Sequence, residues 1–341
     1  MTHRDYVLAA IRHEQTDRIP YTLGFEGSVD AELDAYYGST TWRQKVRPYL
    51  RDVGGVDSLG EKRVDAAHVR DAFGALWRTD RRPWHLEVPA LPEPRMDLMP
   101  WPTAEAFPRY VAEHIGELTG PNAREFSVLH NGWGLFEHSW RIRGFENTMM
   151  DCILNEDFYE ALLDRLTELR LGMVERLRDI PADGILFGDD WGDQRGVIIG
   201  PERWRRFLKP RWAKVYEAVH AQGKIVMSHC CGSVADILPD IIEIGLDVLE
   251  SVQPEPQGMN SFELKKKYGD KITFWGCLGT QSTIQFAKPP EIQAHIDRLC
   301  AEVGQGGGFI LAPAKPLQPG TPPENAAAVV EAFSRQNLPS S

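Results

Sequence analysis

The feature that most constrains the fold is an alternation of short β-rich runs with helical runs along the C-terminal half of the chain. Such an alternation is typical of a parallel sheet or barrel, because parallel strands are joined by crossover connections that are usually helices. The β-rich runs predict seven strands, at residues 21–25, 126–129, 184–188, 224–228, 247–252, 271–275 and 308–312.

Helical runs lie between these strands. Pro201 begins one that carries apolar residues three or four positions apart, and Pro289 and Pro290 begin another. We therefore expect an α/β fold, a (β/α)8 TIM barrel forming a single domain over residues 1–341. We also expect an N-terminal helical extension and a long, irregular, proline-rich excursion over residues 77–108.

Charge and cysteine usage exclude some classes of protein. The formal net charge is −11 and the basic residues are scattered, which argues against a nucleic-acid-binding surface. No apolar stretch approaches the roughly 20 residues that cross a bilayer, and the N-terminus lacks a signal-peptide pattern, so we expect a cytoplasmic protein without membrane contact. The five cysteines do not resemble a disulfide framework, and we expect reduced thiols.

The segment His229-Cys230-Cys231-Gly232 follows a predicted strand. In extended backbone alternate side chains point the same way, so His229 and Cys231 face one direction and Cys230 faces the other. A His-x-Cys pair can chelate a metal, but zinc takes three or four such ligands, so a further ligand must come from elsewhere. The alternative is that the cysteines are small buried residues and the histidine a hydrogen-bonded loop residue. The position at a strand end favours a functional role.

Two adjacent carboxylates, Asp189 and Asp190, follow another predicted strand, with Gln194 and Arg195 close behind. Carboxylates in this place can hold a cationic group, ligate a metal or move protons. The alternative is that one of them caps a helix or pairs with Arg195, and this applies more to Asp189. The two aspartates and Arg195 are candidate catalytic residues.

Three tryptophans each follow or end a predicted strand: Trp133, Trp191 and Trp275. Such side chains can line one pocket and stack on a planar or cationic substrate, although core packing accounts for their positions equally well. Together with Gln194 and Gln253 they are the candidate substrate contacts.

Taken in order, several motifs resemble the uroporphyrinogen decarboxylase superfamily. They include Gly188-Asp189-Asp190-Trp191-Gly192, His229-Cys230-Cys231-Gly232, Trp275-Gly276-Cys277-Leu278-Gly279 and Pro322-Pro323-Glu324-Asn325. The resemblance covers most of the chain and is firmest from about residue 126. It implies a (β/α)8 barrel and one of two chemistries. These are decarboxylation of the acetate arms of uroporphyrinogen and zinc-dependent methyl transfer between a corrinoid and a thiol.

The first of these chemistries fits the sequence poorly. The decarboxylases resembled here carry an arginine-rich segment after the first strand, which grips the porphyrinogen carboxylates. Here the corresponding residues 21–28 contain no arginine. The resemblance therefore does not imply a true uroporphyrinogen decarboxylase.

The second chemistry matches in part. The methyltransferases use a His-x-Cys pair and a distant Cys before a Thr-Pro-x-Glu-Asn motif, and this chain has His229 and Cys231 but Lys315 at the distant position. A protonated lysine is not a metal ligand, so a zinc site would need Cys277, Glu250 or an Asp189-Asp190 carboxylate instead. Lys315 could bind an anion or donate a proton in the barrel mouth, or it could be a solvated loop residue.

Three functional hypotheses follow. The first is a zinc-dependent methyltransferase or demethylase component, with His229 and Cys231 as ligands and a small nucleophile activated at the metal. The second is a metal-independent carboxy-lyase for a smaller carboxylate, bound by Lys315 or Arg195, in which Asp189 or Asp190 stabilises positive charge. The third is a non-catalytic, corrinoid-binding partner subunit. The expected partners are a small-molecule substrate, a corrinoid held as a substrate or on a partner protein, and a second copy in a homodimer.

Overall fold

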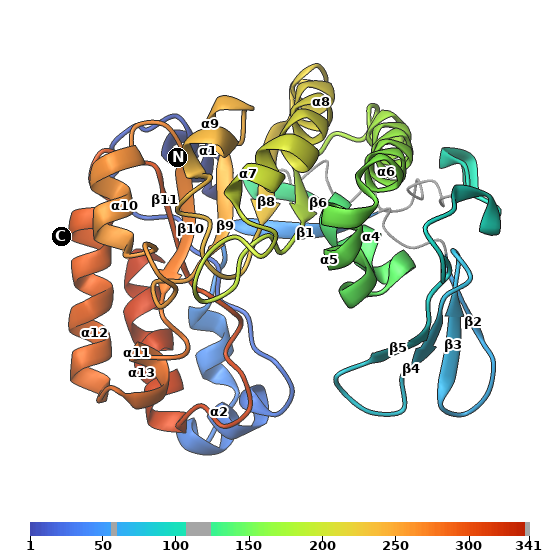
Figure 1. Ribbon diagram of the computed structural model, residues 1–341. Helices are drawn as coiled ribbons and strands as arrows, with labels where there is room; N and C mark the ends of the chain where they lie inside the picture. The colour runs from blue at the N-terminus through green and yellow to red at the C-terminus, as the bar shows by residue number, and fades with distance from the viewer. Residues whose placement is uncertain (56–59, 107–123, 338–341) are drawn as a thin grey trace.

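A computed structural model describes residues 1–55, 60–106 and 124–337, and its centre is a curled sheet of seven parallel strands (Figure 1). In sheet order these are β1 (Leu50–Gly55), β6 (Phe126–Trp133), β7 (Gly184–Gly188), β8 (Ile225–His229), β9 (Val248–Val252), β10 (Thr273–Leu278) and β11 (Phe309–Pro313). Each strand pairs in parallel with the next. The arrangement is a mixed α/β fold compatible with a TIM barrel.

From β6 onward, helices connect successive strands and cover the outside of the sheet (Figure 1). The helices after β6 are α4 (Leu135–Arg143), α5 (Phe145–Leu154) and α6 (Glu156–Arg176). Those that follow are α7 (Pro201–Arg203), α8 (Lys209–His220), α9 (Leu238–Glu243), α10 (Ser261–Tyr268), α11 (Thr283–Phe286), α12 (Pro289–Arg298) and α13 (Pro323–Ser334). At the N-terminus lie α1 (His3–Ile11) and α2 (Val29–Tyr37). No described helix is both long and apolar enough to cross a membrane.

Six of the predicted strands correspond to β6 through β11, and the first prediction needs correction. Residues 21–25 do not form a regular strand but make isolated parallel bridges, Tyr21 with Leu311 and Phe25 with Leu317. On its other side this segment meets the start of β1, because the Tyr49 amide donates to the Tyr21 carbonyl at 3.0 Å. β1 itself was not predicted. The count of eight strands stays a prediction.

The first part of the irregular excursion predicted over residues 77–108 is regular, because it belongs to a small antiparallel sheet that begins earlier, at residue 61. Residues 61–88 contain a four-stranded antiparallel sheet formed by β2 (Glu61–Arg63), β3 (His68–Asp71), β4 (Leu76–Arg78) and β5 (His85–Val88). Two short 3-10 helices, Met96–Leu98 and Ala104–Ala106, follow, and residues 107–108 of the predicted excursion lie outside the described residues. The small sheet has its own apolar cluster and lies to one side of the main body (Figure 1).

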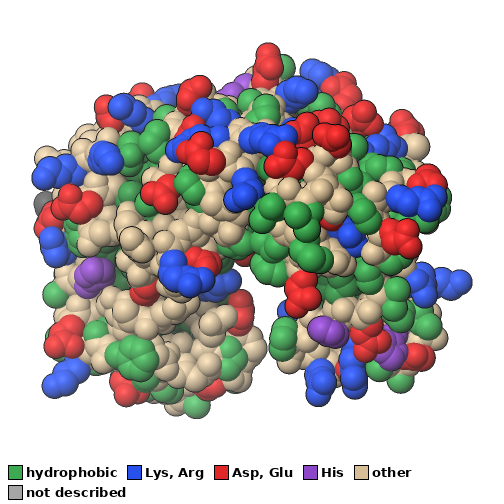
Figure 2. Space-filling model, in the orientation of Figure 1, with side chains coloured by type: hydrophobic (Ala, Val, Ile, Leu, Met, Phe, Trp, Pro, Cys, Tyr) green, Lys and Arg blue, Asp and Glu red, His purple; other side chains and the backbone are tan. Residues whose placement is uncertain are grey.

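The core lies between the parallel strands and the helices that cover them. Phe187 of β7 is fully buried and packs edge-on against Trp212 of α8, with ring centroids 5.3 Å apart. Both faces of a parallel sheet are covered, which explains the nearly continuous apolar runs that identified the strands. Burying each such side chain contributes about 1.5–3 kcal/mol. On the face drawn in Figure 2, acidic and basic side chains are interspersed rather than gathered in one patch.

Candidate metal and substrate site

The strand register brings the candidate residues to one end of the sheet. Gly188, at the end of β7, pairs with His229 at the end of β8, and His229 pairs in turn with Glu250 of β9. The residues that follow these strands therefore lie side by side, as they do at the carboxyl end of a parallel barrel. Asp190 follows β7 by two residues, and Cys231 follows β8 by two.

Three donor groups converge at this edge. One donor atom each from Asp190, His229 and Cys231 lies within 4.8 Å of the other two. His229 Nε2 is 3.2 Å from Cys231 Sγ and 3.7 Å from Asp190 Oδ1. Zinc bonds of about 2.0–2.3 Å place tetrahedral ligands roughly 3.3–3.8 Å apart, so the set fits a zinc ion with one open position. The Cys231 amide also donates to Asp190 Oδ1 at 2.8 Å, which fixes the carboxylate.

Glu250 orients the imidazole from the opposite side. His229 Nδ1 donates to the Glu250 carboxylate, which leaves Nε2 directed at Cys231 and Asp190. Burial lowers the pKa of His229, but the charge of Glu250 and the bond to Cys231 outweigh it, and the pKa lies well above its ordinary value. A carboxylate behind a histidine is the usual support for a metal-binding imidazole. Glu250 therefore lies behind the ligand set rather than within it.

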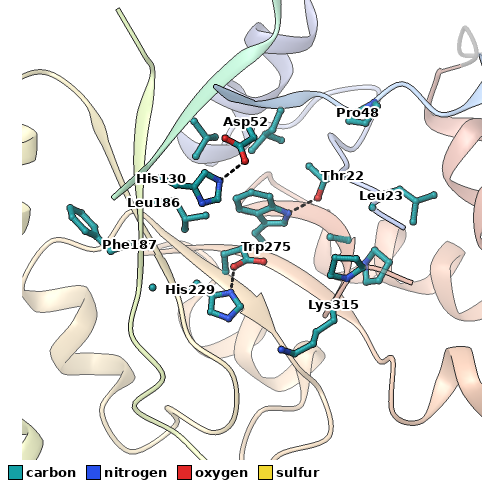
Figure 3. Close-up of a pocket in the computed structure, with 18 of the residues that line it drawn as sticks. Thr22, Leu23, Pro48, Asp52, His130, Leu186, Phe187, His229, Trp275 and Lys315 are labelled. Carbon is teal, nitrogen blue, oxygen red and sulfur yellow. Dashed lines mark hydrogen bonds and ion pairs between the residues drawn. The ribbon is translucent and has the colours of Figure 1, made fainter. Parts of the chain in front are cut away.

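Lys315, which follows β11, points into the same place. Figure 3 shows its side chain directed toward the side of the cavity that holds His229. Burial lowers the pKa of Lys315, but the neighbouring Cys231 thiol, Asp190 and Glu250 together raise the pKa above its ordinary value. A positive charge thus lies beside the donor set, where the resemblance predicted a third thiolate.

Asp189 has a structural position. It is fully buried and accepts hydrogen bonds from the Phe136 and Glu137 amides, at 3.2 and 2.8 Å, in the first turn of α4. The indole N–H groups of Trp191 and Trp212 also donate to it, at 2.7 and 3.1 Å. Burial raises its pKa to about 6, against the effect of these four donors. Asp189 therefore caps α4, a helix that lies far from it in the sequence. The neighbouring Asp190 instead belongs to the donor set.

Several other candidates lie away from the donor set. Arg195 pairs with Asp193 at 3.3 Å and its side chain is 89% exposed. Cys277 is buried on the helix-facing side of β10, near Ser261 and Lys265, and burial raises its pKa to about 12. Cys230 is buried, and its sulfur accepts the Trp191 amide at 3.2 Å. The structure thus adds Asp190, not Cys277, to the His229 and Cys231 pair.

The predicted substrate contacts also lie in different places, some of them away from the cavity. Trp275 lines a cavity, with its indole N–H donating to Thr22 Oγ1 at 2.8 Å (Figure 3). Trp191 is buried against Trp204 and Trp212, and Gln194 is exposed. Gln253 is buried and accepts the Gly232 amide at 2.9 Å, which supports the loop that carries Cys231. The side chain of Trp133 lies outside the described residues.

The cavity has a volume of about 540 Å³ and reaches from the His229 edge across the face of Trp275. Thr22, Asp52 and His130 line it, and none was a candidate from the sequence. His130 directly follows the strand predicted at residues 126–129 and belongs to the longer β6 of the structure. Strand alternation could have identified it as inward-facing if the strand had been extended and β1 with its Asp52 had been recognised beside it. Glu137 was also missed; burial and the charges of Asp189 and Asp190 raise its pKa to about 7.

Two glycines allow the loops after β7 and β8 to touch. A Cβ on Gly192 would lie 2.4 Å from the Ser233 carbonyl oxygen, and one on Gly232 would lie 2.5 Å from the Gly192 carbonyl oxygen. Gly232 also has a positive φ of 82°, which favours glycine. This close approach places Asp190 beside Cys231.

With this geometry in hand, comparison with known proteins identifies the family. The family model described as Uroporphyrinogen decarboxylase (URO-D) matches residues 138–336. The chain belongs to the uroporphyrinogen decarboxylase family. The resemblance drawn from the sequence motifs is therefore confirmed.

Two kinds of relative match the chain, one named as a methyltransferase and the other as a uroporphyrinogen decarboxylase. The methylcobamide:CoM methyltransferase MtaA of Methanosarcina barkeri is 28% identical over 183 residues, 53% of this chain and 50% of that protein. A uroporphyrinogen decarboxylase of Coxiella burnetii (strain RSA 493 / Nine Mile phase I) is 25% identical over 185 residues, 53% of this chain and 48% of that protein. The chain thus spans about half the length of the curated relatives it matches.

A solved structure extends the likeness of fold to the whole chain. A methyltransferase from Methanosarcina mazei superposes with a TM-score of 0.67 and 20% sequence identity, covering 99% of this chain and 100% of that one. At this identity the likeness concerns the fold alone.

Proposed function

We propose that this chain is a zinc-dependent methyltransferase or demethylase component that moves a methyl group between a corrinoid or methylated small molecule and a thiol-type acceptor. The observation that carries the proposal is the convergence of Asp190, His229 and Cys231 within 4.8 Å at the edge of a cavity. The Glu250 carboxylate behind His229 supports it, because metal-binding imidazoles are commonly held in this way. The similarity to a methyltransferase named for a methylcobamide donor supports the same class of reaction.

Different residues of the chain would have different roles in this reaction. When bound, zinc favours the thiolate form of a coordinated acceptor and so supplies a nucleophile near neutral pH. Glu250 holds His229 in the orientation that presents Nε2, and the Cys231 amide holds the Asp190 carboxylate. The Lys315 ammonium lies beside the sulfur and balances negative charge there. Trp275 offers an apolar wall against which a substrate can lie without water.

The donor set leaves room for the incoming group. Three protein ligands with an open fourth position characterise catalytic zinc sites, whereas structural sites are closed by four. The cavity adjoins this open side, since His229 and Lys315 both line it. A corrinoid carried by a partner protein would present its methyl group through the same opening.

Metal analysis together with a methyl-transfer assay tests the proposal. We expect the purified chain to hold about one equivalent of zinc and to transfer a methyl group from methylcobalamin to 2-mercaptoethanol. His229→Ala and Cys231→Ser should each lower zinc affinity and transfer at least about tenfold, because each removes a donor. Cys300→Ser, a thiol change outside the site, serves as the control. A folded, metal-free preparation that gains no activity on addition of zinc would overturn the proposal.

One observation favours a second candidate, a metal-independent carboxy-lyase acting on a smaller carboxylate. Among the described residues that line the cavity, Lys315 is the one lysine or arginine, and it could bind the acid. The exposed Arg195 could not share this role. If Lys315→Ala bound and converted carboxylate substrates normally, this candidate would be dropped.

A further inference from the structure

The end of the cavity far from the donor set carries a polar pair of its own. His130 of β6 and Asp52 of β1 both line the cavity, and His130 Nε2 lies 3.2 Å from Asp52 Oδ2. In Figure 3 this pair lies above His229, with Trp275 beside it. The cavity is therefore polar at two opposite ends, and neither residue of the second pair takes part in the proposed metal site.

The pair is held in a defined geometry. Asp52 Oδ1 accepts the Gly54 amide of its own strand at 2.8 Å, so its other oxygen, Oδ2, is directed at His130. His130 Nε2 lies within ion-pair distance of this oxygen, and in a neutral ring that carries its proton on Nε2 the other nitrogen, Nδ1, is an acceptor. Within residues 1–55, 60–106 and 124–337, His130 Nδ1 has no hydrogen-bond partner. The imidazole is oriented, and one ring nitrogen is free for a ligand.

The surroundings indicate what kind of ligand group would meet His130. Its side chain is 41% exposed and that of Asp52 is 64% exposed, so both are open to the cavity. The one described lysine or arginine of the lining, Lys315, lies at the other end, near Cys231. The charge of Asp52 therefore disfavours an anionic group at the far end and favours a hydrogen-bond donor.

The middle of the cavity is apolar. Val128, Leu186 and Trp275 supply apolar side chains to its lining. A volume of about 540 Å³ is in the range of pockets that bind small organic molecules. A ligand that fills it would have an apolar body and a polar group at each end.

We infer that His130, oriented by Asp52, determines substrate specificity by accepting a hydrogen bond from a hydroxyl or amine group of a small apolar substrate. This inference rests on the proposed function, because that function places the reacting end of the same substrate beside His229 and Cys231. His130 would touch the substrate directly, and Asp52 is a positioning residue that acts through it. An anionic group at this end of the substrate would be rejected.

Binding of three related aromatic probes tests the inference without any reaction. Toluene, 4-methylphenol and 4-methylbenzoate share one apolar body and differ in a single polar group. Isothermal titration of the full chain, metal-free and zinc-loaded, should give a Kd for 4-methylphenol about two- to tenfold lower than that for toluene, the effect of one net hydrogen bond. 4-Methylbenzoate should bind more weakly than 4-methylphenol. Equal affinities for toluene and 4-methylphenol would overturn the inference, as would a preference for the benzoate.

Variants then assign the preference to His130. His130→Phe should abolish the difference between 4-methylphenol and toluene, His130→Gln should retain part of it through its amide oxygen, and Asp52→Asn should reduce it. A purely structural role would weaken both probes equally and leave their ratio unchanged. His85→Phe, the same replacement at an exposed histidine of β5, is the matched control. If His130→Phe does not fold, the ratio in His130→Gln and Asp52→Asn decides, and an unchanged ratio in both contradicts the inference.

The two proposals can fail separately. If the chain binds no zinc but prefers 4-methylphenol through His130, the proposed metal chemistry fails and the recognition of a donor group stands. If zinc binds at Cys231 and the probes show no preference, the inference about His130 fails and the proposed function stands.

Discussion

At the scale of single residues, the adjacent carboxylates Asp189 and Asp190 lie in different surroundings. Asp189 is buried beneath four N–H donors at the start of α4, whereas the Asp190 side chain is 41% exposed and faces His229. The two amides belong to the first turn of α4, so Asp189 caps that helix, and it also gives the two indole N–H groups an acceptor. The sequence favoured a capping role for Asp189 over Asp190, but it could not name the donors, because they come from distant segments of the chain.

Replacing Lys315 tests the charge beside the donor set. We expect Lys315→Met to raise zinc affinity by about tenfold or more, because an ammonium group next to Cys231 repels a divalent cation. Competition titration with a chromophoric zinc chelator measures this change. Lys271→Met, which removes an exposed lysine outside the cavity, is the control. Unchanged or weaker zinc binding in Lys315→Met would show that the lysine does not act on the metal site.

At the scale of elements, the site depends on how closely two loops approach. The loop after β7 carries Asp190 and the loop after β8 carries Cys231, and their backbones touch at Gly192 and Gly232. A methyl group at Gly192 would meet the backbone of Ser233 at 2.4 Å, and backbone atoms have little room to yield. The arrangement of the three donor groups thus depends on residues that are not donors themselves.

Gly192→Ala should therefore separate the loops and weaken zinc binding by about tenfold or more, with all three donor side chains still present. Zinc affinity by chelator competition and folding by circular dichroism measure the two effects. Gly196→Ala is the matched control, because its Cβ would meet only a carboxylate oxygen of Asp236 at 3.9 Å. Equal zinc affinities in the two variants would contradict the role of this close approach.

A second prediction concerns the junction of α8 with β9. His220, the last residue of α8, bonds Asp247 through Nε2 at 2.8 Å, and this bond raises the pKa of His220 above its ordinary value. The folded chain therefore binds this proton more tightly than the unfolded chain does. The resulting stability is fully present below a pH of about 6.5 and is lost as the pH rises through the raised pKa.

Urea denaturation at a series of pH values tests this. The native chain should exceed His220→Gln in free energy of unfolding by up to about 1 kcal/mol at acidic pH, and the difference should shrink above neutrality. Both side chains are partly exposed, which limits the size of the effect. Asp247 still accepts the Val226 amide in the variant, so it keeps a partner. A difference that does not vary with pH would show that the ion pair does not contribute in this way.

At the scale of the whole molecule, the sequence predicted the strands that have clear boundaries. β7 and β8 are short apolar runs that end at polar residues, and both were located from that pattern. β1 was missed because Leu50-Arg51-Asp52-Val53-Gly54-Gly55 contains two charged residues and two glycines, which do not resemble a buried strand. The antiparallel sheet over residues 61–88 was missed because its strands are only three or four residues long, and β2 and β5 are largely exposed.

The site could be predicted only in part. The His-x-Cys spacing identified His229 and Cys231, since two residues on one strand end need no tertiary information. Which further group lies beside them depends on the register of β7 against β8. The sequence left Cys277, Glu250 and an Asp189-Asp190 carboxylate open, and in the structure Asp190 is the one grouped with the pair. The Asp52 and His130 pair joins residues 78 positions apart and could not be found without the fold.

X-ray absorption spectroscopy of the zinc-loaded protein tests the central claim most directly, because it reports the atoms bound to the metal. We predict a first shell with one sulfur at about 2.3 Å and nitrogen or oxygen ligands at about 2.0–2.2 Å, and loss of the sulfur in Cys231→Ser. Cys300→Ser should leave the spectrum unchanged. A zinc shell without sulfur, or one with sulfur that persists in Cys231→Ser, would contradict the assignment of Asp190, His229 and Cys231 as the metal site.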